Sequence, residues 1–154
     1  TGIGDGVGSV INIPLPAGSG ESVYLAAFDR IVIPALYQYS PQLIIVPCGF
    51  DAGFHDPLGR MMLTSGSFRK LAQKVNSAAK DLCDGKLVLT HEGGYAPHTV
   101  PFHCLAVLEE LSGIRTEVID PYSLAFEAAS NQEILPHQDS ALVKAETLLN
   151  KLAP

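Results

Sequence analysis

The sequence predicts an α/β fold around a mostly parallel sheet, and three observations lead to this prediction. Short apolar runs alternate with longer segments of helical periodicity, an order typical of right-handed crossovers between parallel strands. The clearest run, residues 43–48, is continuous and β-branched, as expected for a strand that is covered on both faces. A chain of 154 residues is about one domain's worth, so we expect residues 1–154 to form a single domain.

Three strands are expected, at residues 10–13, 43–48 and 86–90. Three strands make a thin sheet for a chain in which 47% of the residues are hydrophobic. A short parallel sheet also leaves an unpaired edge, which invites pairing with another chain. Two interpretations therefore stay open: the chain is a fragment of a larger sheet, or it associates through an open edge.

The remaining apolar residues recur at threes and fours, which indicates helices. Residues 21–39 are expected to form a helix that Pro34 kinks or splits. Thr64 or Ser65 has the side chain of an N-cap for a helix that ends at Cys83. Further helices are expected at residues 99–111, 121–129 and 139–152.

Composition excludes several classes of protein. The net charge is −6 and the ten Lys and Arg residues are scattered, so we expect no direct binding to nucleic acid. No uninterrupted apolar stretch reaches the ~18 residues of a membrane helix, and no signal peptide is evident, so no membrane partner is expected. The three cysteines lack CxxC spacing, which favours reduced thiols in a cytoplasmic protein.

Two residues follow directly on expected strands. Asp56 lies in CGFDAGFHDPLGRMMLT, residues 48–64, and Tyr95 closes KLVLTHEGGY, residues 86–95. Ligand sites in open α/β sheets lie just past the carboxyl ends of the strands, where a carboxylate can bind a metal and a phenol can donate to an oxyanion. From the pattern alone, Asp56 could equally start an Asp-Pro turn, and Tyr95 could be a surface residue after a Gly-Gly turn. The spacing of His98, His103 and His137 indicates no site.

Together, residues 12–36, 41–64 and 87–95 resemble the zinc-dependent histone deacetylase superfamily. The resemblance runs from Gly2 to about Gly113 and is nearest to the bacterial, class II-like branch that includes acetylpolyamine amidohydrolases. It implies the arginase–deacetylase fold, a three-layer α/β sandwich with a mostly parallel sheet. It also implies a hydrolase that removes acetyl groups from lysine or from a polyamine with the help of Zn²⁺.

The resemblance also implies roles for single residues. Asp56 matches one of the family's three protein zinc ligands, and Tyr95 matches the tyrosine that hydrogen-bonds the substrate carbonyl and its oxyanion. Leu63 matches a position that lines the acyl-lysine channel, and Gly93 and Gly94 are assigned to the same channel.

The chain also departs from the family pattern. The family's Asp-x-His motif, which carries the other two zinc ligands, is absent, and so is its His-His motif. The chain thus looks like the C-terminal portion of a catalytic domain. Its own fold is expected to be incomplete, and the chain alone is expected to lack bound zinc and to be inactive. Its expected partners are a complementing N-terminal segment or a second copy of itself. The alternative is a truncated, non-catalytic domain that serves as an interaction or assembly module.

Overall fold

The computed structural model describes residues 2–152. Its main elements are, in chain order, α1 (Glu21–Ala27), α2 (Ile33–Tyr39), β1 (Ile44–Cys48), α3 (Ser65–Cys83), β2 (Leu87–His91), α4 (Val100–Ser112), α5 (Ser123–Ser130) and α6 (Pro136–Glu146). Within residues 2–152, every helix is too short or too polar to cross a membrane.

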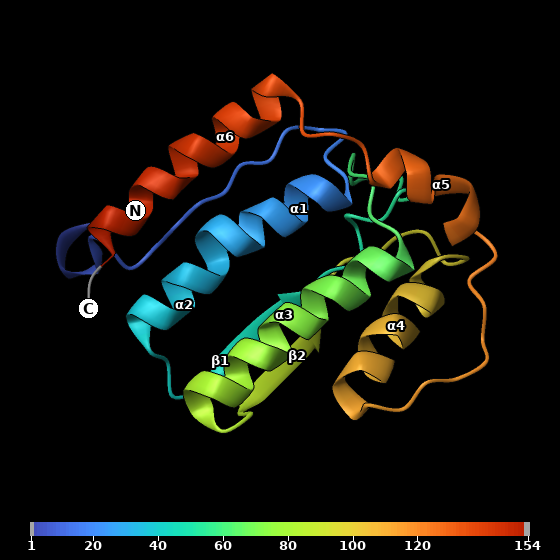
Figure 1. Cartoon of the computed structure of the whole chain (residues 1–154), viewed down its shortest axis with the longest axis horizontal. Coiled ribbons are helices and arrows are strands. Elements are labelled where there is room, and N and C mark those ends of the chain that lie inside the picture. Colours follow the sequence, from blue (N-terminus) through green and yellow to red (C-terminus); the bar gives the residue numbers. More distant parts are fainter. Residues whose placement is uncertain (1, 153–154) are drawn as a thin grey trace.

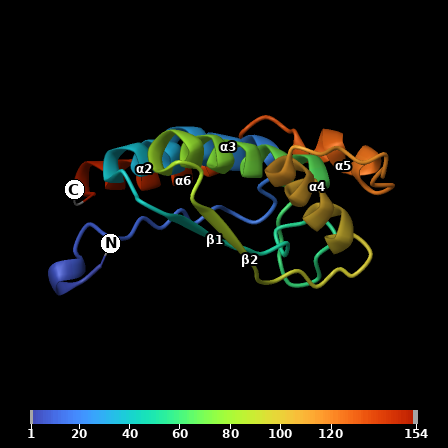
Figure 2. The ribbon, with the colours of Figure 1, turned by 90° about the horizontal axis from the view of Figure 1, so that it is seen from below.

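The sheet is built from β1 and β2, which run parallel with Ile44 opposite Leu87 and Cys48 opposite His91. The crossover between them is α3, which lies over both strands (Figure 1). All the labelled helices lie on the same side of the sheet (Figure 2). The predicted alternation of strand, helix and parallel strand is therefore correct for the central part of the chain.

The strand expected at residues 10–13 is not formed. These residues run as an extended segment between α6 and α1 in the view of Figure 1 and below the helices, near the level of the strands, in Figure 2. Ile11 and Ile13 pack against a buried cluster between α1 and α6 instead of pairing with a strand. The segment has the apolar pattern of a strand, but that pattern does not show whether a partner lies alongside. In the described residues β1 and β2 pair only with each other, although each keeps one free edge. Within residues 2–152 the sheet therefore has two strands, not three.

One face of the sheet is open, against the expectation that both would be covered. Ile45 is 60% exposed and Val88 is 47% exposed, and the two residues are paired in register. Their side chains therefore lie next to each other on the face that the helices leave free. The continuous apolar sequence of β1 is that of a two-sided strand, whereas residues 2–152 cover only one side of it.

The helix expected at residues 21–39 forms as α1, a π-helical turn at Phe28–Val32, and α2. Pro34 lies in the first turn of α2, where its missing N–H is tolerated. The π turn takes up the irregularity that the sequence predicted as a kink, as is usual where one residue is inserted into a helix. Ser40 ends the helix in a left-handed conformation, with φ at 53°.

Helix α3 begins after Thr64, one of the two residues predicted as its N-cap. The Thr64 hydroxyl accepts a hydrogen bond from the backbone N–H of Ser67, and the Ser67 hydroxyl accepts one from the N–H of Thr64. This reciprocal pair is a capping box, which satisfies two donors that the first turn leaves free. Helix α3 then buries Phe68 and Val75 toward the sheet.

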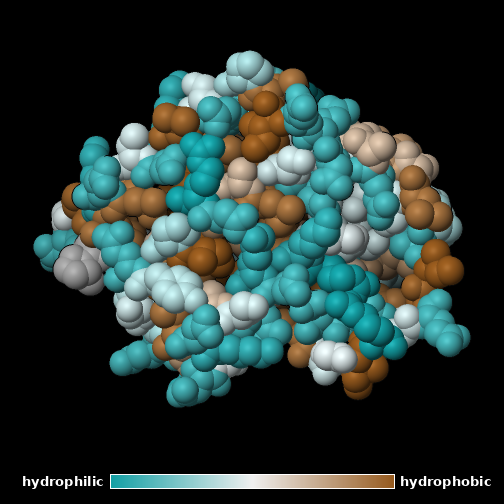
Figure 3. All heavy atoms as spheres, in the orientation of Figure 1, coloured by the Kyte–Doolittle hydropathy of each residue, from teal (hydrophilic) through white to brown (hydrophobic). Residues whose placement is uncertain are grey.

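The C-terminal helix α6 packs against the start of the chain. Leu142 lies in a buried cluster with Val23, Ala27 and Ile31. Arg30 also bonds Asp139 and Glu146, each at 2.7 Å. Hydrophilic side chains cover much of the helical face (Figure 3). The helix expected at residues 139–152 begins earlier, at Pro136, and ends in a 3-10 turn at Thr147–Lys151.

Candidate active site

The loops that follow β1 and β2 stay hydrogen-bonded to each other beyond the strands. The N–H of Glu92 donates to the carbonyl of Cys48 at 3.2 Å, and the N–H of Phe50 donates to the carbonyl of Gly93 at 2.7 Å. Because parallel strands present their carboxyl ends at one edge of the sheet, both loops leave in the same direction. The two motifs that the sequence singled out therefore start side by side.

Asp56 joins the two loops. One of its carboxylate oxygens, Oδ1, accepts the N–H groups of Leu58 and Gly59 at 2.8 Å each. The other oxygen, Oδ2, accepts the N–H of Tyr95 at 2.7 Å. The aspartate thus shapes its own Asp-Pro turn and also holds the backbone of the tyrosine predicted to act with it.

These hydrogen bonds keep Asp56 ionised. Burial of the carboxyl group raises its pKa, but the N–H groups of Gly59, Tyr95 and Leu58 together outweigh burial and hold the pKa below its usual value. Since a carboxylate has about four lone-pair directions and three are used, about one remains for a further partner. The charge and the free direction are compatible with a metal ligand.

The Tyr95 side chain points away from the core. Its side chain is 53% exposed, and its ring lies over Gly93, where an added Cβ atom would approach the ring at 3.4 Å. Only the backbone of Tyr95 is bound to Asp56, so the hydroxyl group is free to meet a molecule outside the loops. Its catalytic role stays a prediction.

Gly93 and Gly94 are needed where they stand for reasons of space. A Cβ atom on Gly93 would lie 2.3 Å from a carboxylate oxygen of Asp51. Gly94 has φ at 138°, and a Cβ atom there would lie 3.0 Å from both Phe50 and Val100. Larger residues would push the Tyr95 loop away from the Asp56 loop, because the backbones could not approach as closely.

Leu63 is buried within residues 2–152, whereas a residue that lines an open channel would be partly exposed. It is 1% exposed and packs with Phe50 and Phe68. It also borders an apolar hollow of about 210 Å³ between the sheet and the helices, together with Val46 and Leu89. The assignment of Leu63 to a substrate channel stays a prediction.

Two histidines lie beside Asp56, His55 and His103, and the sequence assigned neither of them to the site. His103, on α4, is 3% exposed, and a Cβ atom on Gly53 would lie 2.5 Å from its ring. Burial lowers the pKa of His103 to about 4, so the ring is neutral at neutral pH. His55 precedes Asp56, and its Nε2 atom is buried. These rings matter for the site only because they lie near Asp56 in space. The only hint in the sequence was that His103 stands within an otherwise largely apolar helix.

The donor set falls short of a zinc site. Catalytic zinc sites take three protein ligands, usually from His, Asp, Glu and Cys. In the described part of the chain, no three such side chains are grouped so that they could hold a metal ion. Asp56 is one suitable ligand, and a zinc site that used it would need its other ligands from outside residues 2–152.

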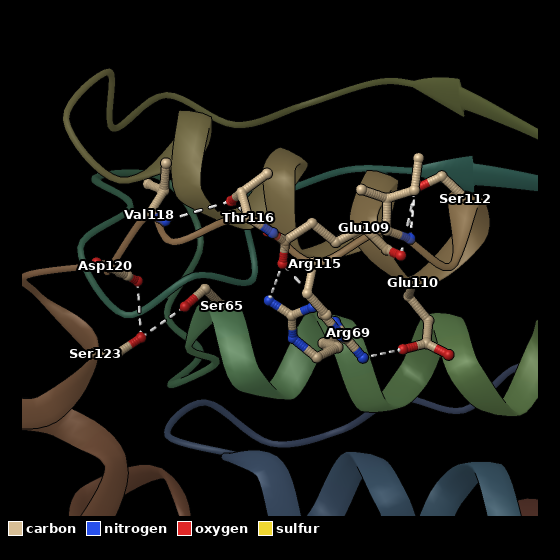
Figure 4. A network of polar contacts seen from close by, with 11 residues as sticks. Ser65, Arg69, Glu109, Glu110, Ser112, Arg115, Thr116, Val118, Asp120 and Ser123 are labelled. Atoms are coloured by element: carbon tan, nitrogen blue, oxygen red, sulfur yellow. Dashed lines mark hydrogen bonds and ion pairs between the residues drawn. The ribbon is translucent and has the colours of Figure 1, made fainter.

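A second polar network fixes the segment after α4 (Figure 4). Glu109 accepts the N–H of Thr116 at 2.7 Å and is paired with Arg69 at 2.6 Å. Hydrogen bonds from the Thr116 hydroxyl, the Thr116 N–H and Arg69 lower the pKa of Glu109 to about 2. Further on, Asp120 accepts the hydroxyl of Ser123 at 2.7 Å, which holds the start of α5.

Comparisons with known proteins define the class to which this fold and site belong. The structure of the histone deacetylase Clr3 superimposes with a TM-score of 0.80 and 30% identity, over 99% of this chain and 23% of that one. The crystal structure of the HDA15 HD domain gives a TM-score of 0.65 and 27% identity, over 97% of this chain and 42% of that one. The architecture is therefore the α/β fold with a parallel sheet of the deacetylase domains, as the sequence predicted.

Sequence comparisons give the family. The histone deacetylase domain model matches residues 1–111, so the chain belongs to the histone deacetylase family. A histone deacetylase-like amidohydrolase from Pseudomonas aeruginosa is 52% identical over 116 residues, 75% of this chain and 30% of that protein. A probable deacetylase from Archaeoglobus fulgidus is 32% identical over 145 residues, 93% of this chain and 39% of that protein. The chain thus spans well under half the length of these relatives.

Proposed function

We propose that the chain forms part of the active site of a zinc-dependent deacetylase that hydrolyses the amide bond of acetyl-lysine or of an acetylated polyamine. The observation that carries the proposal is the hydrogen bond from the N–H of Tyr95 to the Asp56 carboxylate at 2.7 Å. It ties together the two motifs that bear chemical groups, in a chain of the histone deacetylase family.

Zinc is proposed to bind in a complete domain, with Asp56 as one of three protein ligands. The carboxylate is ionised and keeps about one lone-pair direction free, which suits a single Zn–O bond. Bound zinc would supply polarisation of the amide carbonyl. The other two ligands, and the base that activates water, are proposed to come from a segment outside residues 2–152.

Tyr95 is proposed to donate its hydroxyl hydrogen bond to the oxyanion that forms when the amide is attacked. Such a donor stabilises the transition state by about 2.7–4 kcal/mol. The loop geometry supports this role because the backbone of Tyr95 is held on Asp56 while the phenol stays exposed. The role requires that the backbone is held while the side chain stays exposed, since a phenol buried in the core could not contact a substrate.

The substrate is proposed to be acyl-lysine in preference to a polyamine. Leu63, the residue assigned to the channel, is apolar and offers no acidic group for a polycation. An apolar wall favours the methylene stem of lysine, which is buried without cost to a charge. A direct comparison of acetyl-lysine and acetylputrescine as substrates distinguishes the two.

The open face of the sheet is proposed to receive the complementing segment, or a second copy of this chain. Ile45 and Val88 form an exposed apolar pair there, and a two-stranded sheet is marginal alone. We also propose a cytoplasmic location, which rests on the reduced state expected for the three cysteines.

The test is hydrolysis of an acetyl-lysine peptide by the chain combined with its complementing segment. Removing the donor in Tyr95→Phe should lower kcat by about 10²–10³. Tyr39→Phe is a matched control, because Tyr39 lies on α2, far along the chain from the site. Wild-type turnover by the Tyr95→Phe variant would remove the assigned role.

A second candidate function is a non-catalytic interaction or assembly module. It is favoured by the shortage of metal ligands: within the described residues, Asp56 is not grouped with two other side chains that could complete a metal site. The two candidates differ in one outcome: a catalytic domain gains chelator-sensitive turnover when the complementing segment is added, and an assembly module does not.

A further inference from the structure

A small cavity with polar and apolar residues in its lining lies behind the Asp56 loop. It is lined by residues of that loop, of the starts of α3 and α4, and of α5, and it includes His55, His103, Asp120 and Phe126. Its free volume is about 10 Å³, roughly the room that a single water molecule takes. Residues of α5 that form one wall lie outside the part of the chain that the histone deacetylase domain model matches.

Two histidines that line this cavity each have a ring nitrogen without a hydrogen-bond partner. The two nitrogens are Nε2 of His55 and Nδ1 of His103, both buried. Within residues 2–152, only one other buried side-chain nitrogen or oxygen lacks a partner, Nη1 of Arg69. Buried polar atoms in native proteins are nearly always paired, with protein or with ordered water. Two such exceptions at one cavity point to an occupant.

The other polar groups of the wall are already engaged. Asp120 accepts the N–H of Tyr122 through Oδ1 at 2.9 Å and the hydroxyl of Ser123 through Oδ2 at 2.7 Å. The Ser123 hydroxyl also lies 2.6 Å from that of Ser65 (Figure 4). The carboxylate is thus committed to its own turn, and the two imidazoles alone make too few ligands for a metal ion.

Aromatic rings surround His55 at this cavity. Phe126 stacks on Phe54 with the ring centroids 3.9 Å apart, and it meets the ring of His55 edge-on at 4.7 Å. Tyr122 and His98 pack against the same histidine ring at 5.7 and 5.2 Å. These rings limit the access of bulk solvent to the buried Nε2 atom of His55.

We infer that one buried water molecule occupies this cavity and bridges Nε2 of His55 to Nδ1 of His103. Water both donates and accepts, so it pairs with the two nitrogens whichever tautomer each ring adopts. The water ties the loop that carries Asp56 to helix α4, and residues of α5 form another part of the cavity wall. His55 and His103 are therefore positioning residues for that loop, and this role does not depend on zinc or on catalysis.

The experiment is water–protein NOE spectroscopy on the isotopically labelled 154-residue chain. We expect cross peaks with the sign of a long-lived water at the ring C–H protons of both His55 and His103. In His103→Phe, which keeps a ring of similar size without nitrogen, the cross peak at His55 should be lost. His98→Phe is the matched control, because that ring touches His55 but has no orphaned buried nitrogen; it should keep both cross peaks.

A second measurement covers the case in which a variant folds poorly. In urea unfolding, the unfolding equilibrium constant of the His55→Phe, His103→Phe double variant should differ at least about fivefold from the product of the single effects, because both changes remove the same bridge. The inference is overturned if the wild-type chain shows no long-lived water at these rings, or if the cross peak at His55 survives in His103→Phe. It is also overturned if micromolar zinc displaces the water from both rings, since the site would then be a metal site.

Discussion

Replacing Leu142 by alanine tests whether the C-terminal helix is an integral part of the fold. Leu142 is fully buried between α6 and the first helix, against Val23, Ala27 and Ile31. The change removes three carbons, which at about 0.8 kcal/mol each gives about 2.4 kcal/mol of lost burial. A cavity between rigid helices adds to this loss, so we expect the free energy of unfolding to fall by about 3–4 kcal/mol.

The assay is urea denaturation followed by circular dichroism. With a slope of about 2 kcal/mol/M for a chain of this size, the midpoint should fall by about 1.5–2 M. The control is Val143→Ala, one residue further along α6 and half-exposed, which should change stability by less than about 0.5 kcal/mol. A loss below about 1 kcal/mol in Leu142→Ala would refute the reasoning, because α6 would then be only loosely attached.

Two further predictions concern charge and association. The pKa of His103 is about 4 when folded and about 6.5 when unfolded, so the unfolded state binds more protons between these values. Stability should therefore fall by about 2 kcal/mol from pH 7.5 to pH 5. His103→Gln should remove most of that fall while the exposed His137→Gln keeps it, and an unchanged profile in His103→Gln would contradict the assignment. The open sheet face should make the chain self-associate, and Ile45→Lys should give a monomer in analytical ultracentrifugation. Leu108→Lys, at an exposed leucine of α4, should leave association unchanged, and a monomeric wild-type chain would contradict this prediction.

Elements whose signals are local could be predicted from the sequence. The N-cap at Thr64 and the break around Pro34 depend on neighbours within a few residues, and both appear where expected. The placement of Asp56 near Tyr95 was also predictable, because it follows from parallel strands alone. What the pattern did not reveal was that Asp56 would bind the backbone of Tyr95 and leave its hydroxyl exposed.

Elements that depend on distant partners could not be predicted in the same way. Residues 10–13 have the composition of a strand, but Ile11 and Ile13 contribute to a helical core instead. His103 carries no motif, and its importance comes from Gly53 and His55, which are far from it in the sequence. The open face at Ile45 shows the same limit. The apolar sequence of β1 suits a strand that is covered on both faces, and residues 2–152 cover only one of them.

We propose above all that this chain carries one part of a deacetylase site, with Asp56 and Tyr95 among its groups and the remaining groups supplied from elsewhere. The most direct test is the hydrolysis of a fluorogenic acetyl-lysine peptide by the purified 154-residue chain, with zinc present and then with a chelator. We predict no turnover above background in either condition. Turnover that the chelator abolishes would contradict the account, because these residues would then complete the site by themselves.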